Sequence, residues 1–151
     1  MEKIHPKAIF IQLHTYCNAY CINCPHDFTY KTIHSKGKMS NDIWEKILAD
    51  LIAMDYRGQV GFYLLHEPLI ATDLYEKIID VNSKTNAFVV LSTNGSLLTN
   101  NNIQNLISSK PRKVHININS GDKFEYEESM KLNYEETILN TKNFISKAKG
   151  I

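Results

Sequence analysis

The apolar positions along the chain alternate between short continuous runs and longer segments with helical spacing. Four short runs, rich in β-branched and aromatic residues, predict buried strands at 8–13, 60–65, 87–91 and 114–119. Four amphipathic segments predict helices, which begin after Ser40, after Thr72 or Asp73, after Thr99, and at Tyr134, the last extending to Lys149. A short helical turn is expected at 122–130. Strands that alternate with helices predict an α/β fold with a parallel sheet and right-handed crossovers.

The predicted sheet also indicates where the polar residues meet. In parallel α/β sheets, ligands bind at the carboxyl ends of the strands. The first predicted strand leads into a cysteine-containing loop, the second into His66-Glu67-Pro68, and the third into Thr93-Asn94-Gly95. Asn117 and Asn119 end the fourth strand. We therefore expect these polar groups around one site on one edge of the sheet.

Length and composition are those of one globular domain over residues 1–151. Hydrophobic residues make up 43% of the chain and charged residues 22%, a balance that allows a buried core. The formal net charge of +1 does not indicate a nucleic-acid or anionic membrane partner. No apolar run reaches the length of a membrane-spanning helix, and the start of the chain lacks an apolar signal-peptide segment. We therefore expect a cytoplasmic protein with no nucleic-acid and no membrane partner.

All three cysteines of the chain, Cys17, Cys21 and Cys24, lie in one short stretch with the spacing C-x3-C-x2-C. Thiolates this close in sequence can converge on one inorganic centre if the backbone between them forms a loop. An iron–sulfur cluster normally takes four cysteine ligands. Three ligands would leave one iron of a cubane cluster open for a substrate or a cofactor.

Two other interpretations of the cysteines were considered. A disulfide is disfavoured because the cysteine count is odd and no secretion signal is present. A zinc site would take His26 as a fourth ligand beside the three cysteines. Zinc usually joins two separated segments, whereas these candidates lie in one loop, which favours the cluster. We expect His26 to be a solvated loop residue, and His14 either to face the site or to be packed or solvated elsewhere.

Along its whole length the sequence resembles the radical S-adenosylmethionine (SAM) enzymes. The cysteine loop after the first strand looks like the signature of that family and is the specific part of the resemblance. Leu65-His66-Glu67-Pro68-Leu69 resembles the Gly-Gly-Glu-Pro motif after the second strand. Ser92-Thr93-Asn94-Gly95 is similar to a Thr-Asn-Gly turn, and residues 114–119 to a fourth strand that usually reads Ser-hydrophobic-Asp.

The resemblance implies a partial TIM-like barrel with about four of the usual six βα units. It implies a [4Fe-4S] cluster held by Cys17, Cys21 and Cys24, whose fourth iron binds the amino and carboxylate groups of SAM. Reductive cleavage of SAM then yields a 5′-deoxyadenosyl radical that removes hydrogen from a substrate. The positions carried over as cofactor-binding are His66, Glu67, Pro68, Asn94, Asn117 and Asn119.

The expected roles of these positions differ. The backbone around His66 and Glu67 would meet the SAM amino group, and Asn117 would touch the ribose or the carboxylate. Asn94 is expected to shape its turn more than to contact the cofactor. For Glu67 the alternative is a structural role, in which it accepts backbone N–H groups of its own turn.

The chain departs from the family pattern at several positions. Asn23 stands where an aromatic residue often precedes the last cysteine, and His66 stands where the second glycine permits close approach of the backbone. Asn117 and Asn119 replace serine and aspartate and so lose a charge. Two missing βα units would leave an outer strand unpaired, so the chain is either a truncated core or completed by a partner chain.

Three functions fit the sequence. The leading hypothesis is a radical SAM enzyme, or the cluster- and SAM-binding part of one, that acts on a small-molecule or peptide substrate. The resemblance implies an electron donor such as flavodoxin or ferredoxin. The alternatives are a non-catalytic iron–sulfur or interaction module derived from this fold, and a zinc-stapled α/β protein. The three cysteines exclude auxiliary clusters within this chain.

Overall fold

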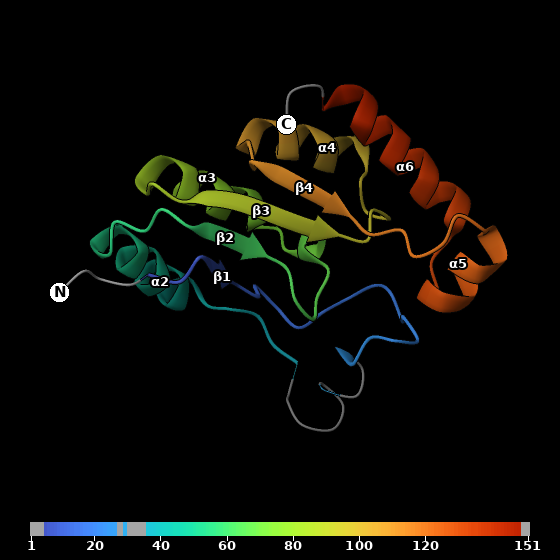
Figure 1. The fold of residues 1–151 in the computed structure, drawn as a ribbon, viewed down its shortest axis with the longest axis horizontal. Helices are drawn as coiled ribbons and strands as arrows, with labels where there is room; N and C mark the ends of the chain where they lie inside the picture. Colours follow the sequence, from blue (N-terminus) through green and yellow to red (C-terminus); the bar gives the residue numbers. More distant parts are fainter. Residues whose placement is uncertain (1–4, 27–28, 30–35, 149–151) are drawn as a thin grey trace.

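A four-stranded parallel sheet forms the centre of the computed structural model, which describes residues 5–26, 29 and 36–148. The strands lie in the order β1-β2-β3-β4 and comprise β1 (Ala8–Phe10), β2 (Gln59–Phe62), β3 (Phe88–Thr93) and β4 (Lys113–Ile116). Three helices connect them along one face: α2 (Asn41–Ala53), α3 (Leu74–Lys84) and α4 (Asn100–Ser109) (Figure 1). The short 3-10 helix η2 (Pro68–Ile70) precedes α3, and α5 (Lys123–Met130) and α6 (Tyr134–Lys147) follow β4. The predicted α/β class and parallel sheet are confirmed.

The strand order shows how the chain is wound. Each strand pairs in parallel with the next one along the chain, with Ile9 opposite Val60, Val60 opposite Val89 and Leu91 opposite Val114. The order never reverses, so every crossover helix stays on the same face of the sheet. This winding is that of a barrel segment and not of a doubly wound sheet. Among the strands that the structure describes, β4 pairs only with β3, so its outer edge is unpaired.

The core lies between the sheet and the connecting helices. Side chains at alternate strand positions point toward the helices and have no solvent exposure: Val60, Phe62, Val89 and Leu91. The helices contribute fully buried side chains at helical spacing: Leu74, Ile78 and Val81 from α3, and Ile103 and Leu106 from α4. This layer fixes the positions of the helices, and therefore also the positions of the loops that connect them to the strand ends.

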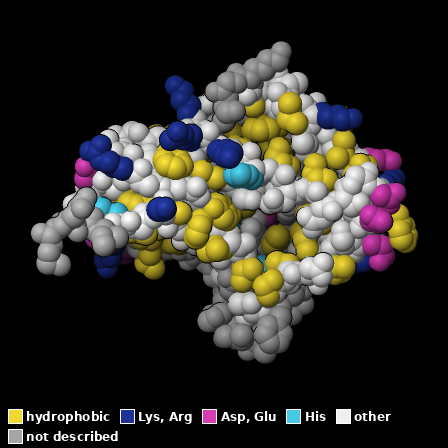
Figure 2. Space-filling model, in the orientation of Figure 1, with side chains coloured by type: hydrophobic (Ala, Val, Ile, Leu, Met, Phe, Trp, Pro, Cys, Tyr) yellow, Lys and Arg dark blue, Asp and Glu magenta, His cyan; other side chains and the backbone are white. Residues whose placement is uncertain are grey.

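Aromatic rings cover part of the opposite face of the sheet. The rings of Phe10 and Tyr63 lie 4.9 Å apart, and a Cβ at Gly61 would come within 2.8 Å of Phe10. A larger residue at this position of β2 would therefore displace the two rings. The guanidinium of Arg112 lies 4.6 Å from the ring centre of Phe88 on the neighbouring strand. Hydrophobic side chains gather on this side of the molecule in the space-filling view (Figure 2).

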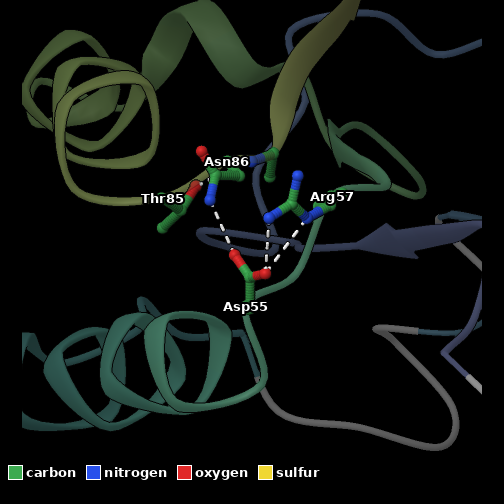
Figure 3. A network of polar contacts seen from close by, with 5 residues as sticks. Asp55, Arg57, Thr85 and Asn86 are labelled. Atoms are coloured by element: carbon green, nitrogen blue, oxygen red, sulfur yellow. Dashed lines mark hydrogen bonds and ion pairs between the residues drawn. The ribbon is translucent and has the colours of Figure 1, made fainter. Parts of the chain in front are cut away.

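At the amino ends of the strands, polar contacts connect the segment before β2 to the segment before β3 (Figure 3). Asp55, which follows α2 with a φ of 48°, accepts two hydrogen bonds from Arg57 at 3.0 and 2.7 Å. Its other oxygen accepts a hydrogen bond of 2.6 Å from Asn86, which precedes β3. The neighbouring Thr85 caps α3 by donating to the carbonyl of Val81. These contacts lie at the end of the sheet opposite the cysteines, and their role is structural.

Several element boundaries differ from the sequence-based expectations. The first strand ends at Phe10, and the fourth ends at Ile116, so Asn117 and Asn119 lie beyond it. The turn expected at 122–130 is the eight-residue helix α5, capped by Asp122, which accepts the N–H of Glu125. In α6, Thr137 is buried, whereas Ile145 is 63% exposed. The end expected for this helix at Lys149, with Gly150 after it, lies outside the described residues.

The helix starts were predicted correctly from polar residues. Ser40 and Thr99 cap α2 and α4 by accepting N–H groups from Ile43 and Asn102. Asp73 precedes α3 but its side chain makes no capping bond, and its Oδ2 binds the ammonium groups of Lys77 and Lys38 at 2.7 and 3.3 Å. In the described part of the chain, no helix combines the length and apolarity needed to cross a bilayer.

The packing of α3 predicts a large difference between two adjacent isoleucines. Ile78 is fully buried against the sheet, whereas Ile79 is 47% exposed. We expect Ile78→Ala to lower the free energy of unfolding by about 2–5 kcal/mol, because it leaves a cavity in the core. Ile79→Ala should cost less than about 1 kcal/mol. Urea unfolding followed by circular dichroism measures both, and equal losses would contradict the orientation of α3.

Candidate functional site

A pocket of about 400 Å³ opens at the carboxyl end of the sheet. Its walls come from the loops after β1, β2 and β3 and from the segment after β4. The pocket is lined by eight of the nine residues that the sequence singled out as metal- or cofactor-binding: Cys17, Cys21, Cys24, His66, Glu67, Asn94, Asn117 and Asn119. The ninth, Pro68, is buried directly behind Glu67 as the first residue of η2. The structure therefore brings the predicted residues to one site.

The cysteine loop lies along the carboxyl-terminal end of α5. The backbone N–H of Tyr20 donates to the carbonyl of Met130 at 3.2 Å, and the N–H of Ile22 donates to Ser129 at 3.0 Å. The last carbonyls of a helix have no partner within the helix. Here the cysteine loop supplies those partners, so α5 holds the segment that carries Cys21. Sequence reasoning assigned no role to α5, because spacing alone does not show which helix end a loop will meet.

His26 closes the cysteine loop at its far end. Its side chain is 6% exposed, and Nε2 lies 2.9 Å from the carbonyl oxygen of Thr15, at the start of the loop. The expectation that His26 is a solvated loop residue is therefore wrong. His14 is also buried, and its Nδ1 accepts the N–H of Tyr16 at 3.0 Å. Two histidines thus fix the backbone on either side of the cysteines.

A single zinc ion and a cubane cluster require different spacings of the cysteine sulfurs. Within the described residues, no three His, Cys, Asp or Glu side chains converge closely enough to hold one metal ion. Tetrahedral zinc needs its sulfur ligands about 2.3 Å from one centre. Three cysteines on a cubane cluster each bind a different iron and therefore lie further apart. Whether the three cysteines hold a cluster or, together with His26, a zinc ion stays a prediction.

Burial makes two of the thiols weaker acids than an ordinary cysteine. It raises the pKa of Cys17 to about 11, with smaller effects from Glu67 and the neighbouring thiols, and it also raises the pKa of Cys21. Cys24 is exposed. Metals bind thiolates, so iron must displace protons from the buried cysteines.

Glu67 connects three parts of the site. Its carboxylate is 2% exposed and accepts hydrogen bonds from the Thr93 hydroxyl at 2.7 Å, the Asn94 N–H at 2.8 Å and the Leu69 N–H at 3.1 Å. Its own N–H donates to the carbonyl of Tyr16, directly before Cys17. Burial raises the pKa of Glu67, and the three donors act in the opposite direction. Both carboxylate oxygens are thus used within the chain, as the structural alternative expected.

Among the residues that line the pocket, His66 has a buried polar side chain without a hydrogen-bond partner. It is 8% exposed, and neither ring nitrogen has a hydrogen-bond partner. Its ring meets the ring of His14 edge-on, with 4.9 Å between the centroids. Burial lowers the pKa of His66 to about 3, and His14 and His26 act in the same direction. His66 is therefore neutral at physiological pH.

The asparagines occupy different parts of the pocket. Asn117 is exposed and donates to the hydroxyl of Ser92 at 2.8 Å, and Asn119 is exposed at the rim. Asn94 is 8% exposed and bonds to Asn18, a residue of the cysteine loop that sequence reasoning missed. An asparagine between two clustered cysteines was the available signal, because its side chain readily bonds to neighbouring backbone and turns.

The neutral state of His66 predicts a pH dependence of stability. In the unfolded chain a histidine takes up a proton near pH 6.5, whereas folded His66 does so only near pH 3. The unfolded state therefore binds more protons between these values, and the free energy of unfolding falls as the pH drops below 6.5. For one group the slope reaches at most about 1.4 kcal/mol per pH unit.

Urea unfolding of the iron-free protein between pH 7 and 5 measures this slope. His66→Gln should flatten it, and His115→Gln, at an exposed position on β4, should leave it unchanged. Identical slopes for the wild type and His66→Gln would show that His66 is not a buried neutral residue in solution.

Comparison with known proteins gives a consistent family assignment. The model of the radical SAM superfamily matches residues 11–149. An S-adenosyl-L-methionine-dependent 2-deoxy-scyllo-inosamine dehydrogenase from Niallia circulans is 23% identical over 128 residues, which are 83% of this chain and 50% of the dehydrogenase.

Solved structures of radical SAM enzymes share the fold. BtrN in complex with AdoMet and 2-DOIA matches 91% of this chain and 56% of its own, with a TM-score of 0.67 and 21% identity. AnSMEcpe with bound AdoMet matches 95% of this chain and 42% of its own, with a TM-score of 0.76 and 19% identity. SuiB of Streptococcus suis bound to the precursor peptide SuiA matches 92% of this chain and 30% of its own, with a TM-score of 0.69 and 21% identity.

These matches cover about half or less of the relatives' own length. The sheet of this chain corresponds to part of their TIM-like barrel, as the sequence predicted. Because the family model spans nearly the whole chain, the protein belongs to the radical SAM superfamily.

Proposed function

We propose that the protein holds a [4Fe-4S] cluster on Cys17, Cys21 and Cys24 and cleaves SAM reductively to a 5′-deoxyadenosyl radical. The observation that carries this proposal is the pocket of about 400 Å³ at the carboxyl end of the sheet, which the three cysteines and most of the predicted cofactor positions line together. Family membership supports the type of reaction. When bound, the cluster would supply the electron for this cleavage, and SAM would supply the group that removes hydrogen from the substrate.

The residues of the chain bind and orient these groups. The cysteine loop, held by α5 and closed by His26, presents the three thiolates. Glu67 fixes the turns after β2 and β3 against the loop, so the pocket wall keeps its shape when the cofactor enters. The backbone at His66 and Glu67 would face the SAM amino group, and exposed Asn117 and Asn119 would contact SAM at the rim. Pro68 and Asn94 would act on SAM through the shape of their turns.

The substrate we propose is a small molecule or a peptide. The relatives include an inosamine dehydrogenase and, among the solved structures, enzymes bound to the peptides SuiA and Cp18Cys. The chain spans about half the length of the dehydrogenase, so the activity of a whole relative is carried over only as a proposal. We further propose a cytoplasmic location, an electron donor such as flavodoxin or ferredoxin, and further polypeptide along the unpaired edge of β4.

A non-catalytic iron–sulfur module is the second candidate. It is favoured by His66, whose side chain occupies the position at which the family motif has glycine and lies at the pocket. In this case the cluster would form, but SAM would not be cleaved.

Anaerobic reconstitution with iron and sulfide tests the proposal. After reduction with dithionite in the presence of SAM, we expect 5′-deoxyadenosine to accumulate, measured by liquid chromatography and mass spectrometry. A stable cluster without product would support the non-catalytic module. A colourless protein that binds zinc and no iron would contradict both.

The cysteine assignment is tested in the same preparation. Cys21→Ala should lose the cluster, and with it the broad visible absorption and the 5′-deoxyadenosine. Asn82→Ala, on α3 and away from the pocket, should retain both. Unchanged iron content in Cys21→Ala would remove Cys21 from the ligand set.

A further inference from the structure

Asn18, between Cys17 and Cys21, takes part in a closed ring of side-chain hydrogen bonds with the turn after β3. Its Oδ1 accepts from Nδ2 of Asn94 at 2.9 Å, and its Nδ2 donates to the hydroxyl of Ser96 at 2.8 Å. The Ser96 hydroxyl donates in turn to Oδ1 of Asn94 at 2.7 Å, which completes the ring. Each of the three side chains is therefore held by the other two.

The ring is anchored to the fold on the side away from the cysteines. The backbone N–H of Ser96 donates to Oδ1 of Asn94 at 2.9 Å, and the carbonyl of Ser96 accepts from Asn140 of α6 at 2.9 Å. The backbone N–H of Asn94 is bound by the buried carboxylate of Glu67. Asn94 and Ser96 thus form a fixed surface, and Asn18 is the one member of the ring that belongs to the cysteine loop.

We propose that Asn18 is a positioning residue, which acts through this ring to fix the Cys17–Cys21 segment against the wall of the cofactor pocket. The inference rests on the proposed role of these cysteines as cluster ligands. The same ring explains Asn94, whose carbonyl oxygen and amide face the loop and the turn. Asn94 positions the cysteine loop and does not bind the cofactor through its side chain.

A positioning role of Asn18 and a general contribution to stability predict different changes at the individual cysteines. Cys17 adjoins Asn18 and is partly buried, whereas Cys24 is exposed and lies beyond the part of the loop that the ring holds. Loss of the ring should therefore make the Cys17 thiol more accessible and leave the accessibility of the Cys24 thiol nearly unchanged. A variant that merely destabilises the fold would expose all three thiols together.

Alkylation of the iron-free protein with iodoacetamide, read at each cysteine by mass spectrometry, is the first test. We expect Asn18→Ala to raise the rate at Cys17 about tenfold, because loop opening no longer breaks two hydrogen bonds. The rate at Cys24 should change less than about twofold. Ser96→Ala removes only the hydroxyl and should have an intermediate effect, so the test stands even if Asn18→Ala does not fold.

Asn82→Ala is the matched control. Asn82 also donates two side-chain hydrogen bonds, both of 2.9 Å, to the carbonyls of Ser109 and Lys110, far from the cysteines. All three alkylation rates should stay at their wild-type values in this variant. In the double variant Asn18→Ala/Ser96→Ala, the effects should not add, because Asn18→Ala already removes both hydrogen bonds between the loop and the turn.

The reconstituted protein provides the second test. Release of iron to a chelator should be about tenfold faster in Asn18→Ala than in the wild type, and the electron paramagnetic resonance signal of the reduced cluster should shift. Wild-type rates at Cys17, or equal increases at all three cysteines, would overturn the inference. A wild type that takes up no cluster would contradict the proposed function, while alkylation of the iron-free protein would still decide whether Asn18 positions the loop.

Discussion

The negative charge of Glu67, buried beneath the pocket, is the constraint on which the arrangement of the site depends. A buried carboxylate is costly unless donors surround it. Here the donors come from the turns after β2 and β3, and the Glu67 backbone also binds the residue before Cys17. Three loops that are distant in sequence are therefore held in one arrangement. Removal of any one donor would weaken the hydrogen bonding of this buried carboxylate, so these loops keep their relative positions together.

Between Cys17 and Cys24 the chain forms no helix or strand, and the shape of this part of the loop depends on what surrounds it. The end of α5 binds its backbone, His26 closes it, and the Asn18 ring ties it to the turn after β3. Each contact joins a polar group of the loop to a group on another part of the chain. The segment that carries the three cysteines is thus ordered by the fold itself, which would reduce the conformational entropy lost on binding the proposed cluster.

Much of this architecture was predictable from the sequence because local rules govern it. Apolar periodicity located the strands and helices, and the geometry of parallel sheets predicted that His66, Asn94 and the cysteines would meet. The extent of α5 was underestimated because its apolar pattern is weak, and the burial of His26 was missed because its partner, the Thr15 carbonyl, is a backbone group. The Asn18 ring joins residues far apart in the chain, and no local pattern reports such a contact. Whether the predicted cofactor residues touch SAM stays a prediction.

The unpaired edge of β4 has a directional consequence. Its backbone groups lie in a sheet in which every strand points toward the pocket. A strand added there in the same direction, whether from more of the same polypeptide or from another molecule, would end beside Asn117 and Asn119. Its following loop would then arrive at the mouth of the pocket. Addition of a strand beside β4 would therefore also complete the wall of the pocket.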